Sequence, residues 1–158
     1  MDARSITETR FGLLKAGQGP ENTIFWEGSY EAGEDMVIVY IQSGSTGISS
    51  ETIQLAEEIV LAAEVFVMKA REHILESFIT DPAKYLQSEQ EHRYLHLDPE
   101  QLPLEMPELI FYDGDEEWML RFADGDFAIC DPFGIAVSFK NKEVLRLEDL
   151  SDSEEIDQ

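Results

Sequence analysis

The sequence predicts an α+β protein built on an antiparallel sheet of about six to seven strands, with one long helix and a short second helix packed on one face. Runs of apolar, aromatic and β-branched residues fill residues 10–42 and 109–150, whereas residues 51–80 repeat with the period of a helix. The connections inside each group of runs are too short for crossover helices, which favours antiparallel pairing. The expected order is three strands, one or two helices, and four strands.

The first group contains three predicted strands. Their sequences are "RFGLLKA" (10–16), "TIFWEGSY" (23–30) and "MVIVYIQ" (36–42). Glycine and proline mark the loop "GQGP" after the first strand, and "EAGED" separates the second from the third. The third run is almost continuously apolar, which is typical of an inner strand.

A long helix is predicted from Glu51 to about Thr80, after a loop in which Ser49 or Ser50 supplies the N-cap. Its apolar stripe consists of Ile53, Ala56, Val60, Ala63, Val67, Ala70 and Ile74, widened by Leu55, Ile59, Ala62 and Phe66. A stripe this wide predicts a helix buried against a sheet. The pair Asp81-Pro82 ends it and opens the short second helix "PAKYLQSEQ" (82–90).

The last third of the chain returns to strands. Their sequences are "LIFYD" (109–113), "WMLRFAD" (118–124), "GIAVSFK" (134–140) and "EVLRLEDL" (143–150). We therefore expect a frayed N-terminus over residues 1–9, a single α+β domain over residues 10–150, and an acidic, disordered tail over residues 151–158.

Strand alternation assigns the side chains of residues 118–123 to two faces. Trp118, Leu120 and Phe122 are expected to pack under the helix. Met119, Arg121 and Ala123 are expected on the opposite face, which we expect to be open to a partner.

Composition favours a cytoplasmic globular protein. The chain has 158 residues, of which 43% are hydrophobic, enough for one domain with a core. It has no apolar run long enough to cross a membrane, and its first residues lack the basic and apolar regions of a secretory signal. One cysteine, Cys130, allows no intrachain disulfide.

Charge is the most unusual property of the sequence. It contains 34 acidic and 11 basic residues, which gives a formal net charge of −23. This charge argues against nucleic acid and anionic membranes as partners, because phosphate binding requires Lys and Arg. It favours a basic protein partner, although acidity that serves only solubility is an alternative.

Two Asp-Gly-Asp sequences supply the candidate site residues. A calcium loop counted from Asp113 needs glycine at its sixth position, where this chain has Trp118. The Asp-Gly pairs at 113–114 and 124–125 are instead interpreted as hairpin turns, since this dipeptide tolerates positive φ. The residues assigned to partner binding are Asp113, Asp115, Glu116, Glu117, Asp124 and Asp126.

The sequence gives little support for a zinc site, a reactive cysteine or an enzyme motif. His92 and His96 have the spacing of a zinc pair, but no third ligand is evident, so two solvated histidines are favoured. Cys130 follows apolar residues with no neighbouring base, which is typical of a buried structural thiol. No nucleophile elbow, phosphate loop or dinucleotide motif occurs. We expect no catalytic residues, no cofactor and no metal.

One resemblance extends along most of the chain. The sequences "RFG", "FWEGSY" and "MVIVYIQ", a long helix, and then "ELIFYDGDEEWMLRFADGDFAICDPFGIAVSFKNKEVLRLEDL" follow one another. This arrangement resembles small acidic bacterial domain-of-unknown-function families that occur beside polymorphic toxin genes. It covers roughly residues 10–150 and rests on strand and turn patterns. Such a resemblance implies an immunity protein, cytoplasmic and without enzymatic activity, that blocks a cognate toxin; it assigns no individual functional residue.

The leading hypothesis is therefore a binding protein, an immunity protein that neutralises a basic toxin by covering its active site or substrate groove. Aromatic anchors would supply affinity, and acidic residues would set association rate and specificity. The alternatives are a small metal-dependent or carboxylate-based enzyme, and a generic acidic accessory protein without a toxin partner. The oligomeric state is left open.

Overall fold

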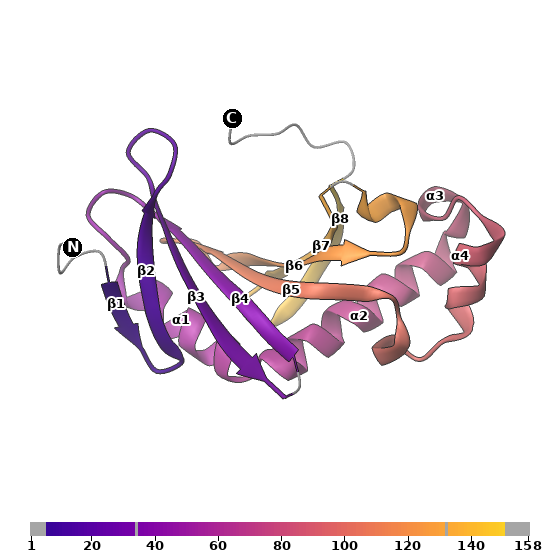
Figure 1. Cartoon of the computed structure of the whole chain (residues 1–158), viewed down its shortest axis with the longest axis horizontal. Helices are drawn as coiled ribbons and strands as arrows, with labels where there is room; N and C mark the ends of the chain where they lie inside the picture. Colours follow the sequence, from indigo (N-terminus) through magenta and orange to yellow (C-terminus); the bar gives the residue numbers. More distant parts are fainter. Residues whose placement is uncertain (1–5, 34, 132, 151–158) are drawn as a thin grey trace.

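A computed structural model describes residues 6–33, 35–131 and 133–150, which form one eight-stranded sheet with helices on one side (Figure 1). The spatial order of the strands is the order of the sequence, from β1 to β8. The strands are β1 Ile6–Thr9, β2 Gly12–Gln18, β3 Ile24–Ala32, β4 Asp35–Ser43, β5 Leu104–Tyr112, β6 Glu117–Gly125, β7 Ile135–Lys140 and β8 Glu143–Asp149. The α+β class is confirmed, with eight strands in place of the expected six to seven.

The two central strands, β4 and β5, pair in parallel, while every other neighbouring pair is antiparallel. The expectation of a wholly antiparallel sheet was therefore wrong at this junction. The physical reason is the helical crossover between Ser43 and Leu104, which returns the chain to the end of the sheet from which β4 started. Two antiparallel four-stranded units thus meet side by side at the centre of the sheet.

The expected long helix is divided into α1, Ser50–Leu61, and α2, Ala63–Thr80. Ser49 caps α1 as predicted, because its side chain accepts a hydrogen bond from the backbone N–H of Thr52. The break lies at Ala62, whose φ of −113° and ψ of 28° leave the helical region. The change of direction lets α1 pack on β5 while α2 crosses β6, β7 and β8 (Figure 1).

The expected second helix also divides into shorter pieces. Pro82 begins α3, Pro82–Tyr85, as predicted, but the helix α4, Glu89–Arg93, starts separately after the N-cap Ser88. The 3₁₀ turns η2, Tyr94–His96, and η3, Pro99–Gln101, complete the crossover. Arg71 of α2 holds this segment, because its guanidinium donates to the carbonyl oxygens of Leu102 and Leu104 at 3.0 and 2.6 Å.

Alternation along the strands decides which side chains enter the core. Trp118, Leu120 and Phe122 are buried beneath the helices, as the sequence predicted. The ring of Phe66 on α2 contacts the ring of Trp118 edge to face, with 5.6 Å between ring centroids. Trp118 in turn stacks on Phe139 of β7 at 4.4 Å. Such aromatic packing adds to area burial and fixes α2 against β6 and β7.

The chain ends differ from expectation in one respect. Residues 6–9, assigned to a frayed N-terminus, form the edge strand β1, which a tight turn at Arg10 and Phe11 joins to β2. Polar side chains in β1 gave no periodic signal, and its pairing with β2 supplies the order. The predicted tail over residues 151–158 lies outside the described residues.

The two Asp-Gly pairs have different structures. Asp113-Gly114 forms the β5–β6 turn as predicted, and Gly114 has a φ of +82°. Asp124-Gly125 is not a turn: both residues lie in β6, paired with Glu105 and Leu104. Gly125 is needed there for close packing, because a Cβ atom would lie 2.8 Å from the Sγ of Cys130. The residues after it form the 3₁₀ turn η4, Ala128–Cys130.

Candidate functional site

The strand positions that alternate with the core form a second face of the sheet. Its side chains lie outside the core cluster that includes α1 and α2. We call it the helix-free face and define it by two cross-strand rows. The first row is Lys15, Glu27, Tyr40, Ile110, Met119, Ser138 and Arg146; the second is Ser29, Ile38, Glu108, Arg121, Ala136 and Glu148.

An ion pair stands at the centre of this face. Arg121 donates from Nη1 to the Oε1 of Glu108 at 2.9 Å, and from Nε to the carbonyl oxygen of Phe133 at 2.7 Å. Burial raises the pKa of the Glu108 carboxyl above its ordinary value, although Arg121 opposes this shift. The pair fixes Arg121 along the sheet and balances the Glu108 carboxylate with a guanidinium.

Tyr40 lies between two carboxylates. It is directly opposite Glu27 on β3, and Glu108 on β5 is opposite Ile38, two residues earlier on β4. Burial, followed by the charges of Glu108 and Glu27, raises the pKa of the Tyr40 hydroxyl, against the effect of Arg121.

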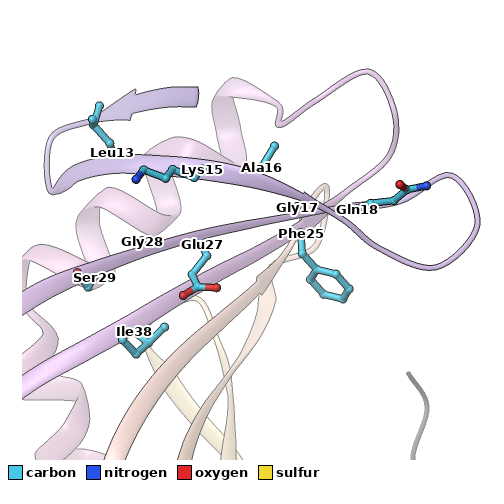
Figure 2. A pocket seen from close by; sticks show the side chains of 10 residues that line it. All are labelled: Leu13, Lys15, Ala16, Gly17, Gln18, Phe25, Glu27, Gly28, Ser29 and Ile38. Atoms are coloured by element: carbon cyan, nitrogen blue, oxygen red, sulfur yellow. The ribbon is translucent and has the colours of Figure 1, made fainter. Parts of the chain in front are cut away.

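A hollow of about 730 Å³ opens over β2, β3 and β4, on the first half of the sheet. Figure 2 shows Phe25, Glu27 and Ile38 projecting to the same side of their strands. Leu13, Lys15, Ala16, Gly17, Gln18, Gly28 and Ser29 complete its lining. Ligand sites in proteins combine apolar walls and a few polar groups in this way, at volumes of about 300–1,000 Å³.

Arg146 and Glu148 of β8 form the far end of the face. Ser138 donates its hydroxyl to the Oε2 of Glu148 at 2.7 Å, and Nε of Arg146 lies 2.6 Å from the same oxygen. Arg146 also approaches the Oε2 of Glu117 at 3.6 Å. The two rows thus contain three bases and three acids, so their formal charges balance: Lys15, Arg121 and Arg146 against Glu27, Glu108 and Glu148.

Asp113, the first sequence-predicted site residue, has a structural role. Its carboxylate accepts from the backbone N–H of Ser49 at 2.8 Å, and the backbone N–H of Gly114 donates to Thr52 at 2.9 Å. Burial pushes the pKa of Asp113 upward, but hydrogen bonds from Ser49, Thr52 and Gly114 outweigh it, so the pKa lies below its ordinary value. A carboxylate held in this way is poorly placed to contact a partner.

Asp115, Glu116 and Glu117 are exposed at the same end of β6. Asp115 accepts from the backbone N–H of Glu117 at 2.9 Å, and Glu116 accepts from the amide of Asn141 at 2.8 Å. Tyr112, the last residue of β5, is 36% exposed, and burial together with the charge of Asp115 raises its pKa. This turn therefore places acids beside an accessible aromatic ring of the helix-free face.

Asp124 and Asp126 are also exposed but lie at the other end of β6. Asp124 accepts the backbone N–H of Gly125, and the backbone N–H of Asp126 donates to the carbonyl oxygen of Pro103. The six predicted residues thus form two separate groups, of which the Asp115 group adjoins the helix-free face.

The histidines and the cysteine, which the sequence analysis considered as metal ligands or nucleophiles, do not form a site. His92 lies in α4 and His96 in η2, and both are exposed. Burial raises the pKa of the Cys130 thiol to about 12, which suppresses the reactive thiolate. Within the described ranges, no three His, Cys, Asp or Glu side chains gather as metal ligands. Among the same residues, no helix has the length and hydropathy to span a bilayer.

Comparison with protein-family models, curated proteins and solved structures gives no match to this chain. The functional interpretation therefore depends on the geometry of the helix-free face itself.

Sequence reasoning placed Met119 and Arg121 on this face but missed Tyr40, Glu27 and Glu108. Glu27 and Glu108 are charged residues inside the apolar runs "FWEGSY" and "PELIFY". A charge within an apolar strand could have identified both residues from the sequence alone. Their proximity depends on strand register, and in particular on the parallel pairing of β4 with β5.

Proposed function

We propose that this protein is a binding protein of the immunity type, which neutralises a basic toxin by covering the toxin's active site or substrate groove. The helix-free face and the acidic β5–β6 turn form the contact surface. One observation carries the proposal: the exposed acids Asp115 and Glu116 of the β5–β6 turn adjoin an uncovered sheet face with aromatic and apolar side chains, in a chain with a net charge of −23.

The parts of this surface suit different stages of binding. Ile110 pairs with Met119 across β5 and β6, and Tyr112 lies two residues after Ile110 on the same side of β5, so these three side chains supply apolar contact area. Buried aromatic anchors commonly dominate interface energies. Asp115 and Glu116, which are exposed beside Tyr112, attract a basic surface from a distance and raise the association rate.

A direct test captures basic proteins from the native cell with the wild-type protein, purifies the partner identified by mass spectrometry, and measures both its affinity and the inhibition of its activity. Tyr112→Ala and Met119→Ala should each weaken affinity by roughly tenfold, as expected for interface anchors. Val65→Ala and Ile79→Ala serve as matched controls, because these side chains of α2 are each 53% exposed. They should leave affinity unchanged.

The outcomes separate the proposal from its competitors. Equal losses from the sheet and helix variants would place the contact elsewhere or reveal a general effect on folding. A partner that binds but keeps its full activity would contradict the immunity role while leaving the binding surface intact.

A further inference from the structure

We propose that a hollow at the carboxyl ends of β4 and β5 binds a neutral sugar unit. The hollow has a volume of about 260 Å³ and is lined by Thr23, Gln42, Ser43, Gly44, Tyr112 and Asp113. One face of the sugar ring lies on Tyr112, and the sugar hydroxyls bond to the side-chain amide of Gln42. This binding goes beyond the proposed function, because it requires no protein partner.

The position of the hollow follows from the parallel pairing of β4 with β5. After Ser43 the chain leaves β4 toward α1 in the helix layer, whereas after Tyr112 it turns directly into β6. The two connections therefore diverge at the same end of the sheet. In open sheets, divergence of the connections from neighbouring parallel strands leaves a crevice in which ligands commonly bind.

Gln42 supplies the recognition group of the hollow. It pairs with Phe25 on β3 and with Tyr112 on β5, so its half-buried amide stands between two aromatic residues. Among the described residues, neither the Gln42 amide nor the Tyr112 hydroxyl takes part in a hydrogen bond, and no side-chain polar atom is both buried and unpaired. The Gln42 amide is therefore open to solvent. It both donates and accepts, which matches sugar hydroxyls that do the same.

The other walls of the hollow are fixed by hydrogen bonds. The hydroxyl of Ser43 accepts the indole N–H of Trp26 and donates to the carbonyl oxygen of Gly44, each at 3.0 Å. Thr23 donates its hydroxyl to the carbonyl oxygen of Pro20 at 2.6 Å. A site whose walls are already ordered loses little conformational freedom when a ligand binds.

Charge at the hollow disfavours anionic ligands. Asp113 is part of the lining, and Asp115 lies close enough to contribute, after burial, to the raised pKa of Tyr112. These carboxylates repel phosphate and carboxylate groups, which argues against nucleotides and sugar phosphates.

The accessible ring of Tyr112 fits the apolar face of a sugar. Tyr112 is 36% exposed, so one side of its ring is available to a ligand. The C–H groups on one face of a pyranose carry partial positive charge and pack against the electron-rich face of an aromatic ring. The hydroxyls at the edge of the sugar then reach Gln42, its direct neighbour across β4 and β5.

The experiment titrates the full-length protein, without any partner, with the methyl glycosides of glucose, galactose, mannose and N-acetylglucosamine while recording amide chemical shifts. At up to about 50 mM, at least one glycoside should shift the side-chain amide of Gln42 and the backbone amides of Gly44 and Tyr112, with a dissociation constant in the millimolar range. Gln42→Leu and Tyr112→Leu should each weaken this binding by roughly fivefold. Gln54→Leu is the matched control, because it removes an exposed amide from α1. It should leave binding unchanged.

Four results would overturn the sugar site. They are no shift at these residues with any of the four glycosides, wild-type binding by Gln42→Leu, equal weakening by Gln54→Leu, and a phosphate ester of the binding sugar that binds as tightly as the neutral sugar. Adenosine is titrated in parallel; stronger binding of adenosine with the same shifts would also contradict the proposal, since it would identify a nucleoside site. Amide signal dispersion shows that each variant is folded.

Discussion

The carboxylate of Asp113 accepts the backbone N–H of Ser49 at 2.8 Å and thereby ties the β5–β6 turn to the start of α1. Gly114 reinforces the link by donating its backbone N–H to Thr52. Thr52 itself is buried in the first turn of α1. The turn that carries the acidic group Asp115 to Glu117 is therefore held by the helix layer, and Asp113 belongs to that support.

Asp113→Ala should lower the free energy of unfolding by about 1–2 kcal/mol at pH 7, because it removes charge-assisted hydrogen bonds from a partly buried site. The pKa of Asp113 is depressed in the folded protein, so its contribution is present above the unfolded value near 3.8 and disappears as pH falls through the folded value. Urea denaturation at pH 7 and pH 3 should show the difference from wild type shrinking in acid. Asp126→Ala, at an exposed position, is the control; a loss independent of pH would contradict this role.

Arg121→Met should cost about 2 kcal/mol, since it leaves the buried Glu108 carboxylate without its partner. The pKa of Glu108 is already raised above its unfolded value near 4.5, so the folded protein holds that proton more tightly. Stability associated with Glu108 is fully present below the unfolded value and is lost as pH rises through the folded value. The deficit of Arg121→Met should therefore be largest near pH 7 and smaller near pH 4.

Glu108→Gln combined with Arg121→Met should recover part of that stability at pH 7, because no buried charge remains. Denaturation midpoints of the single and double variants at both pH values measure the difference. A double variant no more stable than Arg121→Met would show that packing, and not the unpaired charge, accounts for the loss.

Local patterns predicted most of the strands and the N-cap of α1 because each depends on neighbouring residues. The face assignment of Trp118, Leu120 and Phe122 followed from alternation alone. The break at Ala62 could not be predicted, since Leu61, Ala62 and Ala63 all favour a helix and the change of direction is imposed by the sheet beneath. The turn assignment of Asp124-Gly125 failed because the glycine is required there by close packing against Cys130, and not by a turn.

The candidate site was predictable only in part, for a related reason. Exposed acids are visible in the sequence, so Asp115 and Glu116 were found. Whether a carboxylate supports a turn, as Asp113 does, or flanks an aromatic ring, as Glu108 does, depends on which strands are neighbours. The parallel pairing of β4 with β5 places Tyr40 beside Glu108, and no local pattern encodes that pairing.

Removal of calcium or zinc with a chelator should leave the melting temperature unchanged. Trp118 is buried in β6 where a calcium loop requires glycine, and His92 and His96 lie exposed on different helical segments. Thermal unfolding with and without EDTA, followed by calcium or zinc added back, provides the measurement. A fall of several degrees that metal reverses would reveal a site and contradict the expectation.

Cys130 should resist alkylation in the folded protein at pH 8. Cys130 is 4% exposed, and burial raises the pKa of its thiol to about 12, so very little thiolate is present. Iodoacetamide labelling followed by mass spectrometry should show modification only in denaturant. Labelling of native protein at the rate of a free thiol would mean that the region around η4 opens readily.

Charge reversal at the β5–β6 turn tests whether acidity guides the partner. Asp115→Lys, Glu116→Lys and Glu117→Lys together should slow association with the captured partner by roughly tenfold or more at low salt, and dissociation much less. These side chains are exposed and their contacts are a turn hydrogen bond and surface pairs, so folding should survive. In wild type, the association rate should fall steeply as salt rises.

Reversing three acidic residues on the helix side tests whether the association rate depends on the acids of the turn or on the total charge of the protein. Glu58→Lys, Glu72→Lys and Glu76→Lys change the total charge equally, and all three residues are exposed on α1 or α2. If association depends on the acidic turn beside Tyr112, this control slows it far less than the turn variant when both are compared at about 0.1 M salt, where screened charges act mainly within about 10 Å. Equal slowing by both triples would show that only total charge matters. An association rate unaffected by either triple and flat across ionic strength would show that the acidity serves solubility.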